Sequence, residues 1–226
     1  MFDGSGDMPT GLRERKKQRT RATLIDVAMD LCLKQGYDHT TVEQIAAAAD
    51  VSPRTFSRYF ATKDAVFMTL IEDYADAVAD EIASVPAIVG PLEAVRQAHI
   101  AVLTRVAARQ VGRLTTERVV LMLRVINASD ALRRASFDFR HPPTHVLLAE
   151  RMGVDLHDRR ANLVLAVFSS VIVTACGDLI SDTDTVRLGP TVMVDRLNEA
   201  FGYVAQLASD LQAPLPGEPP ASAPGA

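Results

Sequence analysis

Cysteine is scarce in this 226-residue chain, and its placement does not suggest a disulfide or a metal centre. Cys32 and Cys176 each lie in an apolar helical context and follow no metal-ligand spacing. Isolated cysteines of this kind are typical of buried thiols in a reducing compartment. The first eleven residues, MFDGSGDMPTG, also lack the apolar core of a signal peptide. We therefore expect a cytoplasmic protein without a disulfide.

The short motifs that anchor most enzyme active sites are missing as well. No G-x-S-x-G, P-loop or dinucleotide-binding glycine pattern is present, and no acidic pair lies in a recognisable catalytic context. His141 and His145 have the i, i+4 spacing of metal ligands. The prolines between them, Pro142 and Pro143, argue against a regular helix that presents both rings to one ion. We expect no enzyme activity, no cofactor and no metal site.

Signals for β-structure are also absent, since neither strand alternation nor Asn-Gly turns occur beyond Pro86. The helical period continues instead, and the hydrophobic content of 48% is enough for a substantial core. Turn-forming residues interrupt it at Gly90-Pro91, Gly112, Asn127–Asp130, Pro142-Pro143, Gly153 and Gly189-Pro190. The predicted fold class is all-α, with about nine or ten helices.

A long apolar run occurs at Ala161–Gly177, and a transmembrane helix must be considered there. The run is at the short limit for a span, contains polar residues such as Asn162 and Thr174, and ends at Asp178. We predict instead a helix buried within a helical body or between two subunits.

A helix-turn-helix pattern lies in the N-terminal third of the chain. Thr41 and Gln44 can form a reciprocal capping box at the start of a short helix. Asp50-Val51 then makes a tight turn. Ser52 offers a second N-cap, and Pro53 stands at the first helical position, where its missing N–H has no bond to lose.

The second helix of this pattern has an aromatic inner side and a basic outer side. Phe56 and Phe60 are four residues apart on the inner side, whereas the outward positions include Arg54 and Arg58. A helix that enters a DNA groove has this character. An ordinary capped hairpin with a solvated charged face has it too, so the spacing alone leaves both interpretations open.

Thr41–Lys63 resembles the DNA-binding domain of the tetracycline-repressor (TetR) family, with the approximate pattern T-[IV]-x-x-I-A-x-x-A-G-[VI]-S-x-G-T-[LF]-Y-x-[HY]-F-x-[ST]-K. The matching residues are Thr41, Val42, Ile45, Ala46, Ala49, Val51, Ser52, Thr55, Phe56, Tyr59, Phe60, Thr62 and Lys63. Asp50 and Arg54 stand where glycine is usual, and Ser57 stands where the family commonly has a phosphate-contacting tyrosine.

The resemblance implies an N-terminal three-helix DNA-binding domain followed by a helical ligand-binding and dimerisation domain. We place a disordered lead at 1–12, the DNA-binding domain at 13–62 and the body at 63–211. The proline-rich segment 212–226 is predicted to be disordered. The implied partners are a palindromic double-stranded DNA operator, a second copy of the chain and a small-molecule effector.

Position in the motif assigns the DNA contacts. Base contacts are expected from Pro53, Arg54 and Arg58, and phosphate contacts from Thr41, Thr55, Ser57, Tyr59 and Lys63. Because the net charge is −4, any nucleic-acid surface must be local. Six of the eleven residues Gly11–Arg21 are basic, at the start of a first helix that we place from about Thr20 to a C-cap at Gly36. We predict that they form a flexible basic arm on the DNA: Arg13, Arg15, Lys16, Lys17, Arg19 and Arg21.

Two further helices carry predictions about the body. A fourth helix, capped by Thr62 and running to about Val85, is long enough to act as a lever between head and body. The last helix, about Thr191–Leu211, has apolar residues at alternating spacings of four and three, typical of a helix–helix seam. The predicted dimer interface consists of Met193, Leu197, Phe201, Val204, Leu207, Phe168 and Val171.

In the resembling family the body encloses a ligand pocket. Polar residues inside apolar helices are the natural candidates for its lining, and they are His99, Asn127, Asn162 and Thr174, with Arg105 and Cys176 also suitable by type. Ala131–Asp182 is similar to actinobacterial members of the family, some of which sense lipid or acyl-thioester ligands.

The predicted function is a dimeric transcriptional repressor that is released from its operator by a small hydrophobic or amphipathic ligand. One alternative is a helix-turn-helix module that binds a protein partner and has lost operator binding. Another is an all-α enzyme that uses the pocket.

Overall fold

The structure of the protein is a computed structural model that describes residues 8–109, 114–128, 130–177 and 188–212. These residues form ten α-helices and no strand, which confirms the predicted all-α fold. The helices are α1 (Met8–Gln35), α2 (Val42–Ala48), α3 (Pro53–Tyr59), α4 (Lys63–Ser84), α5 (Pro91–Ala107), α6 (Thr116–Ala128), α7 (Asp130–Asp138), α8 (Pro142–Met152), α9 (Arg159–Cys176) and α10 (Pro190–Gln212).

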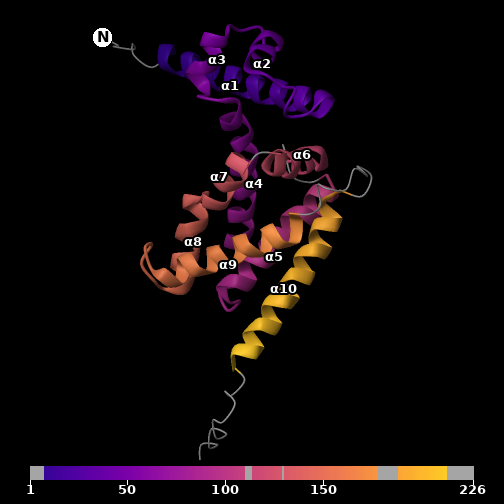
Figure 1. Cartoon of the computed structure of the whole chain (residues 1–226). Coiled ribbons are helices and arrows are strands. Elements are labelled where there is room, and N and C mark those ends of the chain that lie inside the picture. The colour runs from indigo at the N-terminus through magenta and orange to yellow at the C-terminus, as the bar shows by residue number, and fades with distance from the viewer. Residues whose placement is uncertain (1–7, 110–113, 129, 178–187, 213–226) are drawn as a thin grey trace, which may run out of the picture.

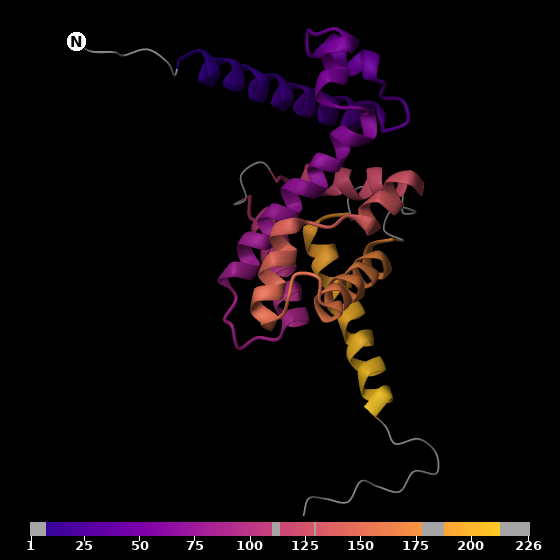
Figure 2. The same cartoon turned by 90° about the vertical axis from the view of Figure 1, so that its left-hand side faces the viewer.

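The molecule has a small head and a larger body joined by one helix (Figures 1 and 2). The head consists of α1, α2 and α3. From it, α4 runs into the body, where α5 and α8 pack against it. The α9 and α10 helices pack against each other and against α5, and the C-terminal part of α10 extends beyond the other helices (Figure 1).

The caps of the helix-turn-helix form as predicted. The Thr41 hydroxyl accepts a hydrogen bond from the Gln44 amide at 3.2 Å, and the Gln44 side chain accepts one from the Thr41 amide at 2.9 Å. The Ser52 hydroxyl accepts from the Thr55 amide at 3.1 Å, with Pro53 opening α3. Asp50 in the turn has φ = 55°, a left-handed conformation that favours glycine and that Asp tolerates better than most residues. The left-handed turn therefore forms here with Asp50 in place of a glycine.

The first helix begins earlier than predicted. The α1 helix starts at Met8 rather than near Thr20, so the basic arm is helical and the predicted disordered lead is wrong for residues 8–12. Arg, Lys, Glu and Gln are good helix formers, and Gln18 and Lys17 both contact Glu14 across one turn, at 3.0 and 3.8 Å. Residues 1–7 and 213–226, which include the rest of the predicted lead and tail, lie outside the described residues.

The predicted lever helix is present. The Thr62 hydroxyl accepts from the Ala65 amide at 3.2 Å, and α4 ends at Ser84, two residues before Pro86. Its buried side chains recur at helical spacing and form one face of the helix, as packing on the body requires. They are Val66, Phe67, Thr69, Leu70, Tyr74, Val78, Ala79 and Ile82.

The α9 helix is the predicted apolar run, and it is only partly covered. Within the described part of the chain it alone has the length and mean hydropathy, 1.4, of a membrane span, and 28% of that window is buried. A core helix in a soluble protein meets the same test. Ala161, Phe168, Val171, Ala175 and Cys176 face the interior, whereas other α9 residues are exposed. The helix is therefore not buried all round within one chain.

This arrangement corrects part of the predicted dimer seam. Met193, Leu197, Phe168 and Val171 are buried inside the single chain, and Leu197 is only 2% exposed. The predicted α10 stripe mixed two surfaces, because its N-terminal half packs on the chain's own body while its C-terminal half extends past it. Phe201 and Val204 are half-buried, and Leu207 is 63% exposed.

Candidate DNA-binding surface and ligand cavity

The outer face of α3 carries the predicted base-contacting residues at the end of the molecule farthest from α10 (Figure 1). Pro53, Arg54, Ser57 and Arg58 are all exposed. The Ser57 hydroxyl donates to the Pro53 carbonyl at 3.1 Å, and the Arg58 guanidinium lies 5.3 Å from the centre of the Tyr59 ring. The surface can thus present two guanidinium groups, which are suited to guanine edges.

The predicted phosphate-contacting residues differ in their surroundings. Thr41 is exposed, whereas Thr55, Tyr59 and Lys63 are half-buried. The hydroxyls of Thr41 and Thr55 take part in helix caps, the latter lying 3.0 Å from the Ser52 hydroxyl. These hydroxyls therefore order the backbone of the head as well as facing its surface.

Lys63 joins the start of α4 to the loop between α1 and α2. Its ammonium donates to the Tyr37 carbonyl at 2.8 Å and lies 3.8 Å from the centre of the Tyr37 ring. The Tyr37 hydroxyl in turn donates to Asp64. Burial, together with this carboxylate, raises the Tyr37 pKa well above its usual value. Lys63 thus anchors the lever to the head, and an ammonium has further N–H groups for a phosphate.

The helical arm places part of its charge beside the helix-turn-helix turn. Residues 11–19 are exposed, and this part of α1 projects from the head (Figure 2). Arg15, Lys16 and Arg19 line a shallow cleft whose other side includes Ala49 and Val51 of the turn. Three positive charges of the arm therefore lie beside the turn that precedes α3.

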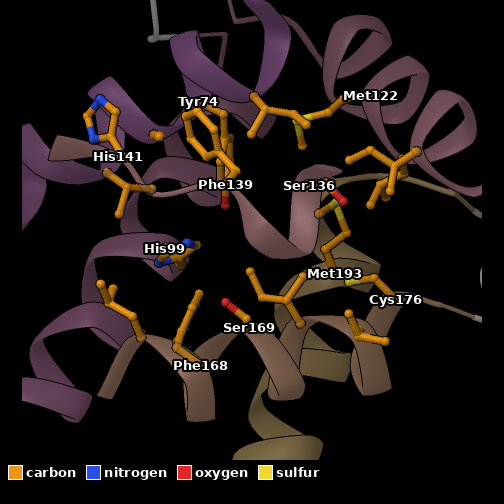
Figure 3. A pocket seen from close by; sticks show the side chains of 18 of the residues that line it. Tyr74, His99, Met122, Ser136, Phe139, His141, Phe168, Ser169, Cys176 and Met193 are labelled. Atoms are coloured by element: carbon orange, nitrogen blue, oxygen red, sulfur yellow. The ribbon is translucent and has the colours of Figure 1, made fainter. Parts of the chain in front are cut away.

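The body encloses a cavity of about 470 Å³ between α4 and α10. Each helix from α4 to α10 contributes side chains to its wall. Most of the wall is apolar, including Ile71, Val78, Met122, Leu165 and Met193. Figure 3 shows Tyr74, His99 and Ser169 along one side, with the sulfur-bearing residues Met122, Met193 and Cys176 on the other. A mostly apolar wall with few polar groups is the usual character of a small-molecule site.

Two of the four predicted pocket residues are at this cavity. His99 and Asn127 line it, as does Cys176, which was suitable by type. Asn162 and Thr174 are exposed on the outer side of α9 and do not line it, so those assignments are wrong. A helix that is apolar all round shows no periodicity that would identify its inner face. Arg105 is also outside, paired with Glu81.

Several lining residues were not predicted from the sequence. Tyr74 sits in the apolar stripe of α4, where it could not be told from a core residue, and Ser169 lies in the α9 run. Phe139 and Ser136 reach the cavity from the region of α7 and the segment after it. The indication in the sequence was that Tyr74 adds a hydroxyl to a mostly apolar inward stripe.

His99 is the more deeply buried of the two histidines in the cavity wall. It is 8% exposed, with its ring 4.0 Å from that of Phe168 and 5.6 Å from that of Tyr74, measured between centroids. Burial lowers its pKa to about 4, although a hydrogen bond to the Val95 carbonyl opposes the shift. The imidazole is therefore neutral at pH 7.

Two contacts tie the cavity wall to other parts of the molecule. Arg118 at the start of α6 donates to Asp26 of α1. His141 caps α8, and its ring lies 2.9 Å from the Thr144 hydroxyl and 3.0 Å from Asp76 of α4. Pro142 and Pro143 occupy the first turn of α8, which therefore begins after His141 and does not contain both histidines. The described residues contain no group of three or more metal-binding side chains.

A helix-turn-helix head on a helical body that encloses a cavity has the architecture of a transcriptional regulator. The model of the family "Bacterial regulatory proteins, tetR family" matches residues 24–69. HTH-type transcriptional regulator TcmR of Streptomyces glaucescens is 39% identical over 185 residues, 79% of this chain and 81% of that protein. The chain therefore belongs to the TetR family of DNA-binding transcriptional regulators, whose members are not enzymes.

A solved structure shows the same fold. The repressor FadR of Thermus thermophilus, a TetR-family protein solved in complex with lauroyl-CoA, superimposes with a TM-score of 0.52. The alignment covers 90% of this chain and 100% of that one at 20% identity. At this identity the likeness extends to the fold alone.

Proposed function

We propose that this protein is a dimeric repressor, acting in the cytoplasm, that binds a palindromic operator and is released by a small hydrophobic or amphipathic ligand. Residues 13–62 form the DNA-binding domain and 63–211 the ligand-binding and dimerisation body. The observation that carries the proposal is that α4 belongs to both units. Its N-terminus is held to the head by Lys63 and Tyr37, while its Tyr74 and Val78 line the cavity.

The DNA contacts follow from the exposed side chains of the head. Arg54, Arg58 and Pro53 face the bases, while Thr41, Thr55, Ser57, Tyr59 and Lys63 hold phosphates. Arg15, Lys16 and Arg19 of the helical arm extend this surface along the backbone of the duplex.

The ligand acts through α4. A ligand that fills the cavity pushes on the inner face of α4 and changes the separation of the two recognition helices in a dimer. Half-sites one helical turn apart are about 34 Å apart, so a small rotation of one head loses the contacts of one half-site. A coupling of about 1–3 kcal/mol changes operator occupancy several-fold.

The dimer forms through the uncovered faces of α9 and α10. Leu163 is 62% exposed and Leu207 63% exposed, and Val173 and Tyr203 are exposed as well. On α9 the exposed Leu163, Ser170 and Val173, with the half-buried Ala166, recur at helical spacing and are small or apolar. Such faces suit a four-helix contact with a second copy.

Operator titration with and without ligand tests the proposal. Full-length protein is titrated with DNA from its own promoter at several salt concentrations, alone and with fatty acids, acyl-thioesters and hydroxylated ring compounds. We expect salt-dependent, sequence-preferring binding that weakens with one of these compounds, and linkage requires the operator to weaken ligand binding by the same factor. Absence of any salt-dependent preference for promoter DNA would instead favour the protein-interaction alternative.

A further inference from the structure

We propose that the cavity selects an uncharged ring compound bearing a hydroxyl group, which donates a hydrogen bond to Nε2 of His99 and accepts one from the Tyr74 hydroxyl. The inference rests on the proposed function, because this ligand would be the effector. It narrows the class from any hydrophobic or amphipathic compound to a neutral alcohol or phenol.

The hydrogen-bonding role of His99 follows from its backbone contact. Nδ1 lies 2.9 Å from the Val95 carbonyl, which can only accept, so Nδ1 carries the proton. Because burial keeps the imidazole neutral, Nε2 is left with a lone pair. The described residues supply no hydrogen-bond partner for Nε2, although the side chain is more than nine-tenths buried at the cavity wall. An acceptor in the wall of a cavity that no described group of the chain satisfies favours a ligand that donates.

Tyr74 supplies the complementary group. Its ring neighbours that of His99, and it too is more than nine-tenths buried while lining the cavity. Burial raises its pKa, so the hydroxyl keeps its proton and can donate. Within the described ranges no side chain or backbone group accepts from it. A ligand hydroxyl can both donate and accept, which satisfies His99 and Tyr74 together.

The shape of the wall favours a ring. Tyr74, His99 and Phe168 follow one another along one side of the cavity, and Phe168 also contacts Phe201, with centroids 5.8 Å apart. Flat aromatic faces pack well on a planar or compact ring. The opposite side offers Met122, Met193 and Cys176, adaptable groups without formal charge (Figure 3).

The inner wall disfavours a carboxylate. A carboxylate cannot donate to Nε2, and protonating His99 to receive it would place a charge in an apolar site. Arg133 and Arg140 lie at the exposed rim, where an anionic group could be held instead. Binding of a hydroxyl by His99 and binding of an anion by the rim arginines therefore predict opposite preferences among ligands that differ in only one substituent.

Three probes of one ring system separate the modes: 2-naphthol, 2-methoxynaphthalene and 2-naphthoate. Calorimetric titration of full-length protein at pH 7 should show that 2-naphthol binds about three- to tenfold more tightly than the methyl ether, which can accept from Tyr74 but cannot donate to Nε2 of His99. It should also bind more tightly than the anion. Preference for 2-naphthoate, equal binding of all three probes, or no binding would overturn the inference.

Two substitutions locate the preference. Tyr74→Phe removes the hydroxyl that donates to the ligand oxygen and should weaken 2-naphthol and its ether alike, because both oxygens can accept; His99→Phe keeps a ring, removes the acceptor and should lower the advantage of 2-naphthol over its ether at least threefold. His157→Phe, in the loop before α9, is an exposed matched control and should leave this advantage unchanged. Should His99→Phe fail to fold, Tyr74→Phe alone decides, because unchanged affinity for 2-naphthol in that variant would contradict the inference.

Operator titration in the presence of the probes distinguishes the two proposals. If 2-naphthol binds with the expected preference but leaves operator affinity unchanged, the cavity assignment stands and the release mechanism fails. If operator is released by another compound while the probes show no hydroxyl preference, the release mechanism stands and this inference fails.

Discussion

At the scale of single residues, replacing Arg54 and replacing Lys63 should have different effects on DNA binding. Arg54→Ala should cost about 1–3 kcal/mol of operator binding and relax the preference at one base pair, because the guanidinium that reads a base edge is removed. Lys63→Ala should weaken all DNA alike and lower the salt slope by about one unit. Binding to a set of single-base operator variants measures both. An unaltered preference in Arg54→Ala would refute the base contact.

His99 should contribute to the pH dependence of stability, because it takes up a proton on unfolding. Its folded-state pKa, about 4, lies below the ordinary value of 6.5, so the unfolded chain binds a proton that the folded chain does not between these values. The free energy of unfolding should therefore fall as pH is lowered from about 6.5 to 4. The contribution of His99 is at most about 1.4 kcal/mol per pH unit.

Urea unfolding across that pH range, with His99→Phe as the comparison, measures the contribution. In the variant, the change in the free energy of unfolding per pH unit should be smaller by the contribution of His99. The contributions of the carboxyl groups should remain. Identical slopes in the two proteins would show that His99 is not protonated on unfolding in this range.

At the scale of helices, α6 offers a second connection between cavity and head. Its Met122, Leu123, Ile126 and Asn127 line the cavity, and its Arg118 is paired with Asp26 of α1. Displacement of α6 by a ligand would therefore act on α1 as well as on α4.

Asp26→Asn should reduce the factor by which ligand weakens operator binding, because the ion pair between α6 and α1 is removed. Ligand affinity should change little, since Asp26 is not at the cavity. Operator titrations with and without ligand give the factor directly. Glu72→Gln, which removes the longer 3.9 Å pair with Arg21 between α4 and α1, is the comparison variant. A factor unchanged in Asp26→Asn would leave α4 as the sole connection.

One side of the helical arm of α1 should contribute more to DNA binding than the other. Replacing Arg15, Lys16 and Arg19 by Ala should lower the affinity for all DNA and reduce the salt slope by about 0.9 for each phosphate that the arm no longer neutralises. Arg13 and Lys17 project from a different side of the helix, and Lys17 is paired with Glu14 at 3.8 Å. The Arg13→Ala, Lys17→Ala protein should lose less affinity, and equal reductions would indicate a flexible arm.

At the scale of the whole molecule, the dimer should depend on the outward faces of α9 and α10. Leu163→Asp with Leu207→Asp would bury charges against a partner but leave the protomer core intact, because both side chains are exposed in the single chain. We expect monomers in sedimentation and weak operator binding. Ile88→Asp with Val146→Asp, equally apolar and exposed elsewhere, should remain dimeric.

The choice of exposed positions matters for this test. Leu197 belongs to the seam predicted from the sequence, but it is buried in the protomer, so Leu197→Asp would unfold the body whether or not a dimer exists. A double Leu163, Leu207 variant that stayed dimeric would place the interface on another face.

The sequence by itself determined the local structure of this protein. The capping pairs of Thr41 with Gln44 and of Ser52 with Thr55, the proline at the start of α3 and the apolar face of α4 depend on neighbours within a few residues along the chain. The family was recognisable for the same reason, since its motif is one continuous stretch.

Only the tertiary structure decided which side of each body helix faces the cavity, a neighbour or a second copy. The α9 helix is apolar on several sides, so Asn162, Thr174 and Ser169 could not be told apart until α5, α8 and α10 covered one face. Leu197 and Leu207 belong to one sequence stripe, yet only the first lies against the body, because α10 extends past it. Periodicity reports that a face is apolar, whereas the identity of what covers that face is a property of residues distant in the chain.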